Sequence, residues 1–238
     1  MLSVNLKKTS CMFFSNRTTH VSLDIKFNGS KILQVENTKF LSVQIDNNLS
    51  WKEHCQKVNV STSRTLGILR KLKYVLPPKA LLSIYNTFIL PHLEYGILAW
   101  GKSSSINLSK LFIVQKKSLR IINHLNSKAH SAPLFTKCNT LPIFELYKYH
   151  LGIIMYKFNR NILPSTISSL FTKKSEIHCY NTRNPKNLYI NLARTSKYKS
   201  TVRHQGPLFW NTLPSPLLLS TTVHNFKKLL KRYLLNNV

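Results

Sequence analysis

The chain has few acidic residues. Only 7 of its 238 residues are Asp or Glu, against 35 Lys or Arg, which gives a formal net charge of +28. Catalysis that needs several carboxylates around one metal pair is hard to build from so few acids. A bias toward AT-rich codons would explain many lysines, but it would not explain so few Asp and Glu, whose codons can be equally AT-rich. A charge this far from zero instead favours a polyanionic partner.

Cysteine is also scarce, with four residues at long and irregular spacings: Cys11, Cys55, Cys138 and Cys179. No C-x2-C pair is present, so we expect no zinc site and reduced, intracellular thiols. His178-Cys179 is an adjacent pair of potential ligands, and a lone pair is more often incidental. None of the nine histidines lies in a recognisable hydrolase signature, which argues against an independent hydrolase. No apolar run approaches the ~20 residues that span a bilayer, so we expect no membrane partner.

The expected polyanion is DNA or RNA, because phosphate contacts release counterions and give affinity that does not depend on sequence. An anionic membrane surface and an acidic protein are the alternatives. No acid follows Glu176, whereas basic residues continue to the C-terminus with Tyr180, Tyr189 and Tyr198 among them. Basic groups with interleaved aromatic rings are typical of single-stranded or template–primer binding. Each single tyrosine is better explained as a core residue.

The first 49 residues favour β-structure. Asn28-Gly29 lies between Val21–Phe27 and Ile32–Val35, and this dipeptide is the strongest short signal for a hairpin. Lys39–Ile45 predicts a further strand. Residues 1–23 contain basic and hydroxyl side chains and no acid, as in a mitochondrial transit peptide. Against that interpretation, Cys11-Met12-Phe13-Phe14 predicts a short apolar strand.

From residue 50 the hydrophobic period becomes helical. Ser50-Trp51-Lys52-Glu53 fits a capping box, and apolar residues follow at spacings of three and four. Pro77-Pro78 predicts the end of this helix and the start of a second, which we expect to stop near Pro91. A loop with Gly101 should follow. We expect the three tryptophans to be core anchors: Trp51, Trp100 and Trp210.

A third helix is predicted from about Leu108 to Leu125, with its lysines and arginine mostly away from the apolar stripe. A fourth should begin near Pro142 and a last one near Thr222. Residues 160–206 are polar, basic and weakly periodic, which predicts irregular structure. Glu94 and Glu145 should lie at helix ends or starts.

Several blocks, in order, resemble the C-terminal part of a reverse transcriptase from a jockey-like non-LTR retrotransposon. Leu2–Thr9 with Met12–Phe14 is similar to the segment after the aspartate motif of the polymerase palm. Lys39–Asp46 with Leu49-Ser50-Trp51 is similar to the block that closes the palm, although Ser42 stands where the family usually has Gly. The later blocks resemble the thumb and the tail: Tyr85, Pro91–Gly96, Ala99–Gly101, Leu111, Gln115–Lys117, Arg120–Ile122, Tyr180–Arg183, Gly206-Pro207, Trp210-Asn211, Leu213-Pro214 and Phe226–Lys228.

The resemblance implies that the parent enzyme is an RNA-directed DNA polymerase, whose palm holds Mg²⁺ on paired aspartates. This chain has only Asp24 and Asp46, and Asp46 is better explained as a turn residue that accepts hydrogen bonds from nearby backbone. We therefore expect no catalytic residue, metal or cofactor here, and no enzyme activity of the chain as it stands. Either the chain is a fragment of a decayed or split element, or its gene model starts late.

The resulting prediction is an α+β chain with a small β-hairpin remnant of the palm (1–49), a helical thumb-like region (50–127) and a helical to irregular basic C-terminal region (128–238). It would grip template–primer DNA or RNA, with a separately encoded palm or a full-length element protein as a further partner, and would be nuclear. The unpaired edge of the remnant should be exposed. The candidate binding residues are Lys7, Lys8, Lys116, Lys117, Arg120, Arg183, Arg194, Lys197, Lys199 and Arg203.

Three alternatives stay open. A basic RNA-binding structural protein, for instance a mitochondrial one, would explain the charge but not the order of the blocks. A partner subunit would dock its β edge onto a palm encoded elsewhere. An enzyme requires that the gene extend upstream.

Overall fold

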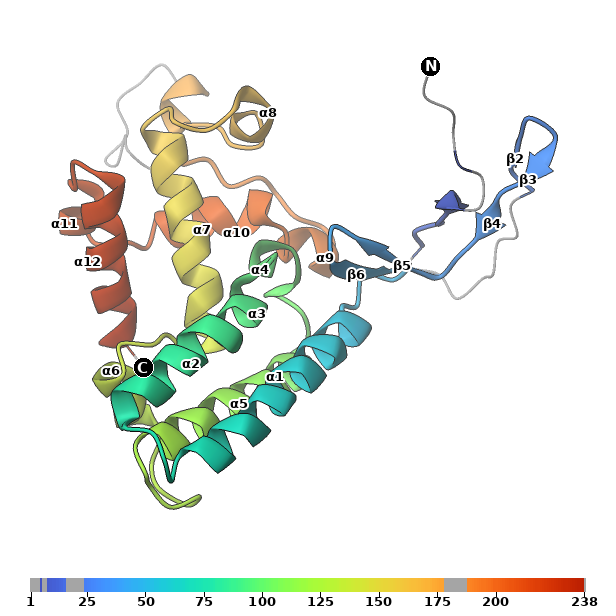
Figure 1. Ribbon diagram of the computed structural model, residues 1–238. Coiled ribbons are helices and arrows are strands. Elements are labelled where there is room, and N and C mark those ends of the chain that lie inside the picture. Colours follow the sequence, from blue (N-terminus) through green and yellow to red (C-terminus); the bar gives the residue numbers. More distant parts are fainter. Residues whose placement is uncertain (1–4, 6–7, 16–23, 178–187, 238) are drawn as a thin grey trace.

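Strands occupy the N-terminal part of the chain and helices the rest (Figure 1). The structure, a computed structural model, describes residues 5, 8–15, 24–177 and 188–237. The last strand ends at Asp46 and the first long helix begins at Lys52. The predicted α+β class is therefore confirmed. Figure 1 shows the strands projecting from one side of the helical body.

The N-terminal strands form short pairs. The hairpin of β2 (Lys26–Phe27) and β3 (Ser30–Lys31) turns at Asn28-Gly29, where both φ angles are positive, at 48° and 77°. This confirms the predicted turn. β1 (Ser10–Cys11) pairs in parallel with β4 (Leu33–Gln34). The strand predicted for Cys11–Phe14 is wrong beyond Cys11, because pairing with the two-residue β4 ends there.

The strand predicted for Lys39–Ile45 is a second hairpin, made of β5 (Asn37–Phe40) and β6 (Val43–Asp46). Leu41 and Ser42 form its turn with positive φ angles of 44° and 67°. Neither residue type favours a positive φ angle, so this turn could not be predicted from the residue types at its two positions. The Tyr95 hydroxyl donates to the Leu41 carbonyl at 2.7 Å and holds the turn. Leu41 is 72% exposed.

The capping box predicted at Ser50–Glu53 is wrong. α1 (Lys52–Leu72) begins after Trp51, whose φ of 61° is left-handed, and the Glu53 side chain accepts a hydrogen bond from the Asn37 amide instead. The Asp46 carboxylate organises the entry, because it accepts hydrogen bonds from the backbone N–H groups of Asn48, Ser50 and Trp51. The turn role predicted for Asp46 is thus confirmed.

The next helices follow the prolines. α2 (Pro78–Phe88) begins at Pro78 and ends at Phe88, close to the predicted stop near Pro91. Pro91 itself lies in the first turn of a further short helix, α3 (Leu90–Glu94). Proline is tolerated there because the first helical turn has no intrahelical partner for its N–H. α4 (Ile97–Trp100) replaces part of the predicted loop, and α5 (Ser105–Ile122) begins and ends three residues before the predicted bounds.

The C-terminal half is more helical than predicted. α7 (Ile143–Asn159) follows Pro142, and Thr222 caps α12 (Val223–Leu235), both as predicted. The region 160–206 is predicted to be irregular, yet α10 (Val202–Trp210) begins within it. The low helix propensity of Gly206 and Pro207 argued against a helix there. The short elements are α6 (Ala132–Lys137), α8 (Ser165–Ser168), η2 (Lys174–Glu176), α9 (Ser196–Lys199) and α11 (Ser215–Leu218).

The core gathers around α7, which packs against α4, α5, α10 and α12. Trp100 and Trp210 are buried anchors as predicted, whereas Trp51 is half-buried at the edge of the core. Tyr156 of α7 stacks on Phe226 of α12 with ring centroids 4.4 Å apart. No helix in the described part of the chain is long and apolar enough to cross a membrane.

Candidate nucleic-acid interface

The three basic residues predicted on α5 have different environments. Lys117 is exposed. Lys116 is half-buried, with its Nζ 4.6 Å from the centroid of the Phe112 ring, a cation–π contact. Arg120 is half-buried, and its Nε donates to the Ala129 carbonyl at 2.8 Å. That bond uses one of five guanidinium donors and fixes the direction of the side chain.

Helix packing brings further cations to this place. α1 packs along α5, and the two helices run in the same direction, since Cys55 near the start of α1 lies 3.5 Å from Ser103 just before α5. Their C-terminal ends therefore meet. Arg70 lies on α1, and Lys73 is the first residue after it. Together with Lys117 and Arg120 of α5 they line a cavity of ≈ 360 Å³, here called the α1–α5 pocket.

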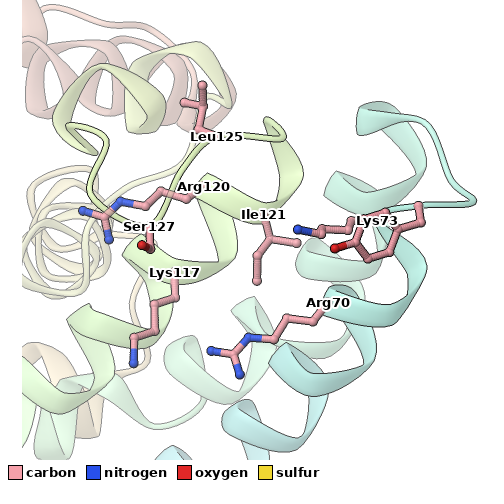
Figure 2. A pocket seen from close by; sticks show the side chains of 8 residues that line it. Arg70, Lys73, Lys117, Arg120, Ile121, Leu125 and Ser127 are labelled. Atoms are coloured by element: carbon pink, nitrogen blue, oxygen red, sulfur yellow. The ribbon is translucent and has the colours of Figure 1, made fainter.

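Figure 2 shows how the α1–α5 pocket is built. Arg70 and Lys73 extend toward α5, and Ile121 lies between the two helices. Leu125 and Ser127, from the segment after α5, close the other side. Arg70 and Lys73 were not among the predicted binding residues. The cluster Arg70-Lys71-Lys73, at the end of a predicted amphipathic helix, was the signal that could have found them.

Electrostatics favour an anion at this pocket. Four cationic side chains line it, and no carboxylate is among its lining residues in the described part of the chain. The C-terminal ends of α1 and α5 contribute about −0.5 charge each, which offsets only part of four full positive charges. The region is therefore positive, and clustered like charges gain from an anionic ligand.

An exposed aromatic ring adjoins these cations. Tyr74 lines the pocket and is 81% exposed. The Lys73 ammonium lies 4.6 Å from the centroid of its ring. A large aromatic side chain left in solvent beside four cations is an arrangement that suits base stacking next to phosphate.

The predicted basic residues of the C-terminal region lie elsewhere. Arg194, Lys199 and Arg203 are exposed on or near α9 and α10. Lys197 of α9 donates from its Nζ to the Asn48 carbonyl at 2.6 Å, which ties this segment to the loop before α1. α1 rises about 30 Å over its 21 residues. The two basic regions thus lie at opposite ends of α1 (Figure 1).

The remaining predicted residues are only partly described. Lys8 is exposed near β1, and Lys7 and Arg183 lie outside the described residues. Tyr189 and Tyr198 are half-buried, and Tyr180 and the His178-Cys179 pair also lie outside the described part. Of the described ones, Lys8, Tyr189 and Tyr198 are not among the residues that line the α1–α5 pocket.

The acidic residues serve structural roles. Asp24, which lies before β2 and not in a strand, pairs with Lys26 at 3.3 Å and Lys31 at 3.4 Å. The Asp46 carboxylate is engaged by three backbone N–H groups. Glu94 ends α3 and Glu145 lies in the first turn of α7, as predicted. Within the described residues, no three His, Cys, Asp or Glu side chains come together.

The chain is similar to RNA-directed DNA polymerases of mobile elements. The enzyme of the element jockey from Drosophila melanogaster is 25% identical over 126 residues, which cover 50% of this chain. The probable enzyme of transposon BS from the same species is 25% identical over 157 residues, or 63% of this chain. The jockey enzyme of Drosophila funebris is 26% identical over 128 residues, or 51% of this chain.

The matched stretch spans only 13%, 17% and 14% of these three relatives, in the same order. No protein-family model and no solved structure matches the chain. The relationship to non-LTR retrotransposon polymerases, expected from the order of the sequence blocks, is supported at this level of identity.

Proposed function

We propose that this chain is the thumb and C-terminal part of a retrotransposon RNA-directed DNA polymerase and that it grips template–primer nucleic acid. The observation that carries the proposal is the α1–α5 pocket, where two helices bring four cations together without a carboxylate in its lining among the described residues. The similarity to the jockey and BS polymerases supports the choice of nucleic acid over other polyanions.

The basic surface is wide enough for several phosphates. The α1–α5 pocket lies at one end of α1, and Arg194, Lys199 and Arg203 lie near its other end. A strand that reached both regions would cross about 30 Å along α1. At about 6–10 phosphate contacts, affinity should fall about 10³–10⁵-fold between 50 and 200 mM salt.

The test measures the affinity of the purified chain for a template–primer duplex by fluorescence anisotropy across this salt range. A double variant, Arg70→Gln with Lys117→Gln, should lower the magnitude of the log–log salt slope by about 2. The matched control is Lys26→Gln with Lys31→Gln, which removes the same charge from two lysines that already pair with Asp24. An affinity that does not change with salt concentration, or no binding to any polynucleotide, would contradict the proposal.

Grip without catalysis is the second part of the proposal. In support, Asp46 organises the start of α1, Asp24 pairs with two lysines, and these are the two aspartates of the sequence. Primer extension by the chain with Mg²⁺ and nucleotides should therefore give no product. Robust synthesis would contradict this part and leave the binding part standing.

A further inference from the structure

A large aromatic side chain beside the α1–α5 pocket is left mostly in solvent. Tyr74 lies in the turn after α1 and is 81% exposed, beside Val75 at 78%. Exposing a tyrosine ring forfeits the burial energy that an aromatic side chain normally contributes. Lys73 lies over the ring but covers little of it, since most of the side chain stays in contact with solvent.

The wall beside Tyr74 is apolar and the rim is cationic. Ile121 and Leu125 line the cavity, and Leu125 is 45% exposed. Arg70, Lys117 and Arg120 line it as well. A cavity of ≈ 360 Å³ lies within the size range of small-ligand sites, which are about 300–1,000 Å³. An apolar wall, an aromatic ring and cations together match the three parts of a nucleotide that need different partners.

We infer that the α1–α5 pocket takes one unpaired nucleotide of a bound strand, with its base stacked on Tyr74 and its phosphates at Arg70, Lys117 and Arg120. The inference rests on the proposed nucleic-acid grip and makes it more specific. A base inside a duplex is stacked on its neighbours and offers no free face, whereas an unpaired base has one. The pocket therefore selects an unpaired stretch beside the duplex.

The lysine over the ring leaves one face of Tyr74 for stacking. The Lys73 ammonium lies 4.6 Å from the Tyr74 centroid, so a cation occupies one face. This contact restricts the orientation of the ring, because the ammonium is attracted to the negative face of the ring. A base on the opposite face completes a cation–aromatic–base stack, and Lys73 stays close enough to meet a flanking phosphate.

The test compares the affinities of the full chain for a single-stranded oligodeoxynucleotide, the oligoribonucleotide of the same sequence and the blunt duplex. Tyr74→Ala should weaken binding to the two single strands about 5- to 100-fold and change duplex binding by less than about twofold. Tyr74→Phe keeps the stacking face and should restore most of the affinity. Val75→Ala, at the adjacent exposed position, is the matched control and should have no effect.

A second measurement locates the base. A single strand that carries 5-iodouracil should photocrosslink to the peptide that contains Tyr74, and Tyr74→Ala should abolish that crosslink. If Tyr74→Ala binds single strands as the wild-type chain does, while Arg70→Gln with Lys117→Gln still lowers the salt slope, this inference fails and the proposed grip stands. If no polynucleotide binds at all, both fail. A loss restricted to RNA or to DNA would support the pocket and identify its strand.

Discussion

The side-chain amide of Gln115 on α5 donates a hydrogen bond of 3.0 Å to the Tyr85 hydroxyl on α2, and both residues are fully buried. The same amide donates to the Leu141 carbonyl at 3.2 Å, and its oxygen accepts from the Ile143 N–H at 2.8 Å. One side chain thus joins α2, α5 and the start of α7. Burial raises the pKa of Tyr85, against the effect of its bond with Gln115, so the hydroxyl stays neutral.

Gln115→Leu should destabilise the fold by about 2–4 kcal/mol, because it leaves three buried polar groups without this partner. Tyr85→Phe should cost only about 1 kcal/mol, since the Gln115 amide keeps its bond to Leu141. Urea unfolding followed by circular dichroism measures both. Equal losses for the two variants would show that Gln115 is not the centre of the network.

Ser42→Gly should stabilise the chain by about 0.5–1 kcal/mol. Ser42 has a φ of 67° in the turn between β5 and β6, a region that costs residues with a Cβ about 1–2 kcal/mol, partly offset by the greater entropy of glycine in the unfolded chain. Ser63→Gly, at an exposed position inside α1, is the control and should instead destabilise. A loss of stability in both variants would contradict the strain assigned to Ser42.

The helices that begin at proline or threonine were predictable because their signals are local. Pro78, Pro142 and Thr222 each stand at or just before a helix start, as expected. The β5–β6 turn was not predictable, since Leu41 and Ser42 carry no turn signal and the long-range Tyr95 hydroxyl bond holds the turn. Asp46 replaced the expected capping box for a similar reason: its carboxylate accepts from the N–H groups of Asn48, Ser50 and Trp51, and the Ser50 N–H is the one that Glu53 would have bonded in a capping box.

Some residues of the candidate site were predictable from the sequence and others were not, for the same reason. Lys117 and Arg120 could be found from the exposed face of a predicted helix. Arg70, Lys73 and Tyr74 could not be joined to them, because α1 and α5 pair through packing between residues far apart in the sequence, such as Cys55 and Ser103 at 48 positions, which periodicity does not encode.

Asp46→Ala should destabilise the fold by about 2–3 kcal/mol. Its carboxylate accepts from Ser50 and Trp51 at 2.9 Å and from Asn48 at 3.2 Å, and its removal leaves the entry to α1 unsatisfied. Asp46→Asn keeps one oxygen acceptor and should lose less. Asp24→Asn breaks only exposed ion pairs and should change stability by less than about 0.5 kcal/mol. Thermal unfolding should rank the three variants in this order.

Stability should fall as the pH falls below about 6.5, in part because of His54. Burial, and to a lesser degree Lys57, lowers the pKa of this side chain, whose Nδ1 accepts from the Gln44 N–H. The unfolded chain therefore binds the proton more readily, and the stability that is fully present above about pH 6.5 is lost toward the lower folded-state pKa.

His54→Asn keeps an acceptor for Gln44 but cannot titrate, so it should reduce the change in urea midpoint between about pH 7.5 and about pH 5.5. His124→Asn is the control, because His124 is exposed and its φ of 54° suits asparagine. The same pH dependence in the wild-type chain and in His54→Asn would rule out this assignment.

Two adjacent lysines should differ in their effect on nucleic-acid binding. Lys117 is exposed and lines the α1–α5 pocket, so Lys117→Gln should lower the magnitude of the salt slope for a template–primer duplex by about 1. Lys116→Gln should change it less, because the Lys116 ammonium lies over the Phe112 ring and its side chain is half-buried. The two variants carry the same change in net charge, so overall electrostatics predicts equal slopes. Equal slopes would therefore assign binding to the diffuse charge of the chain, and unequal slopes would assign it to the α1–α5 pocket.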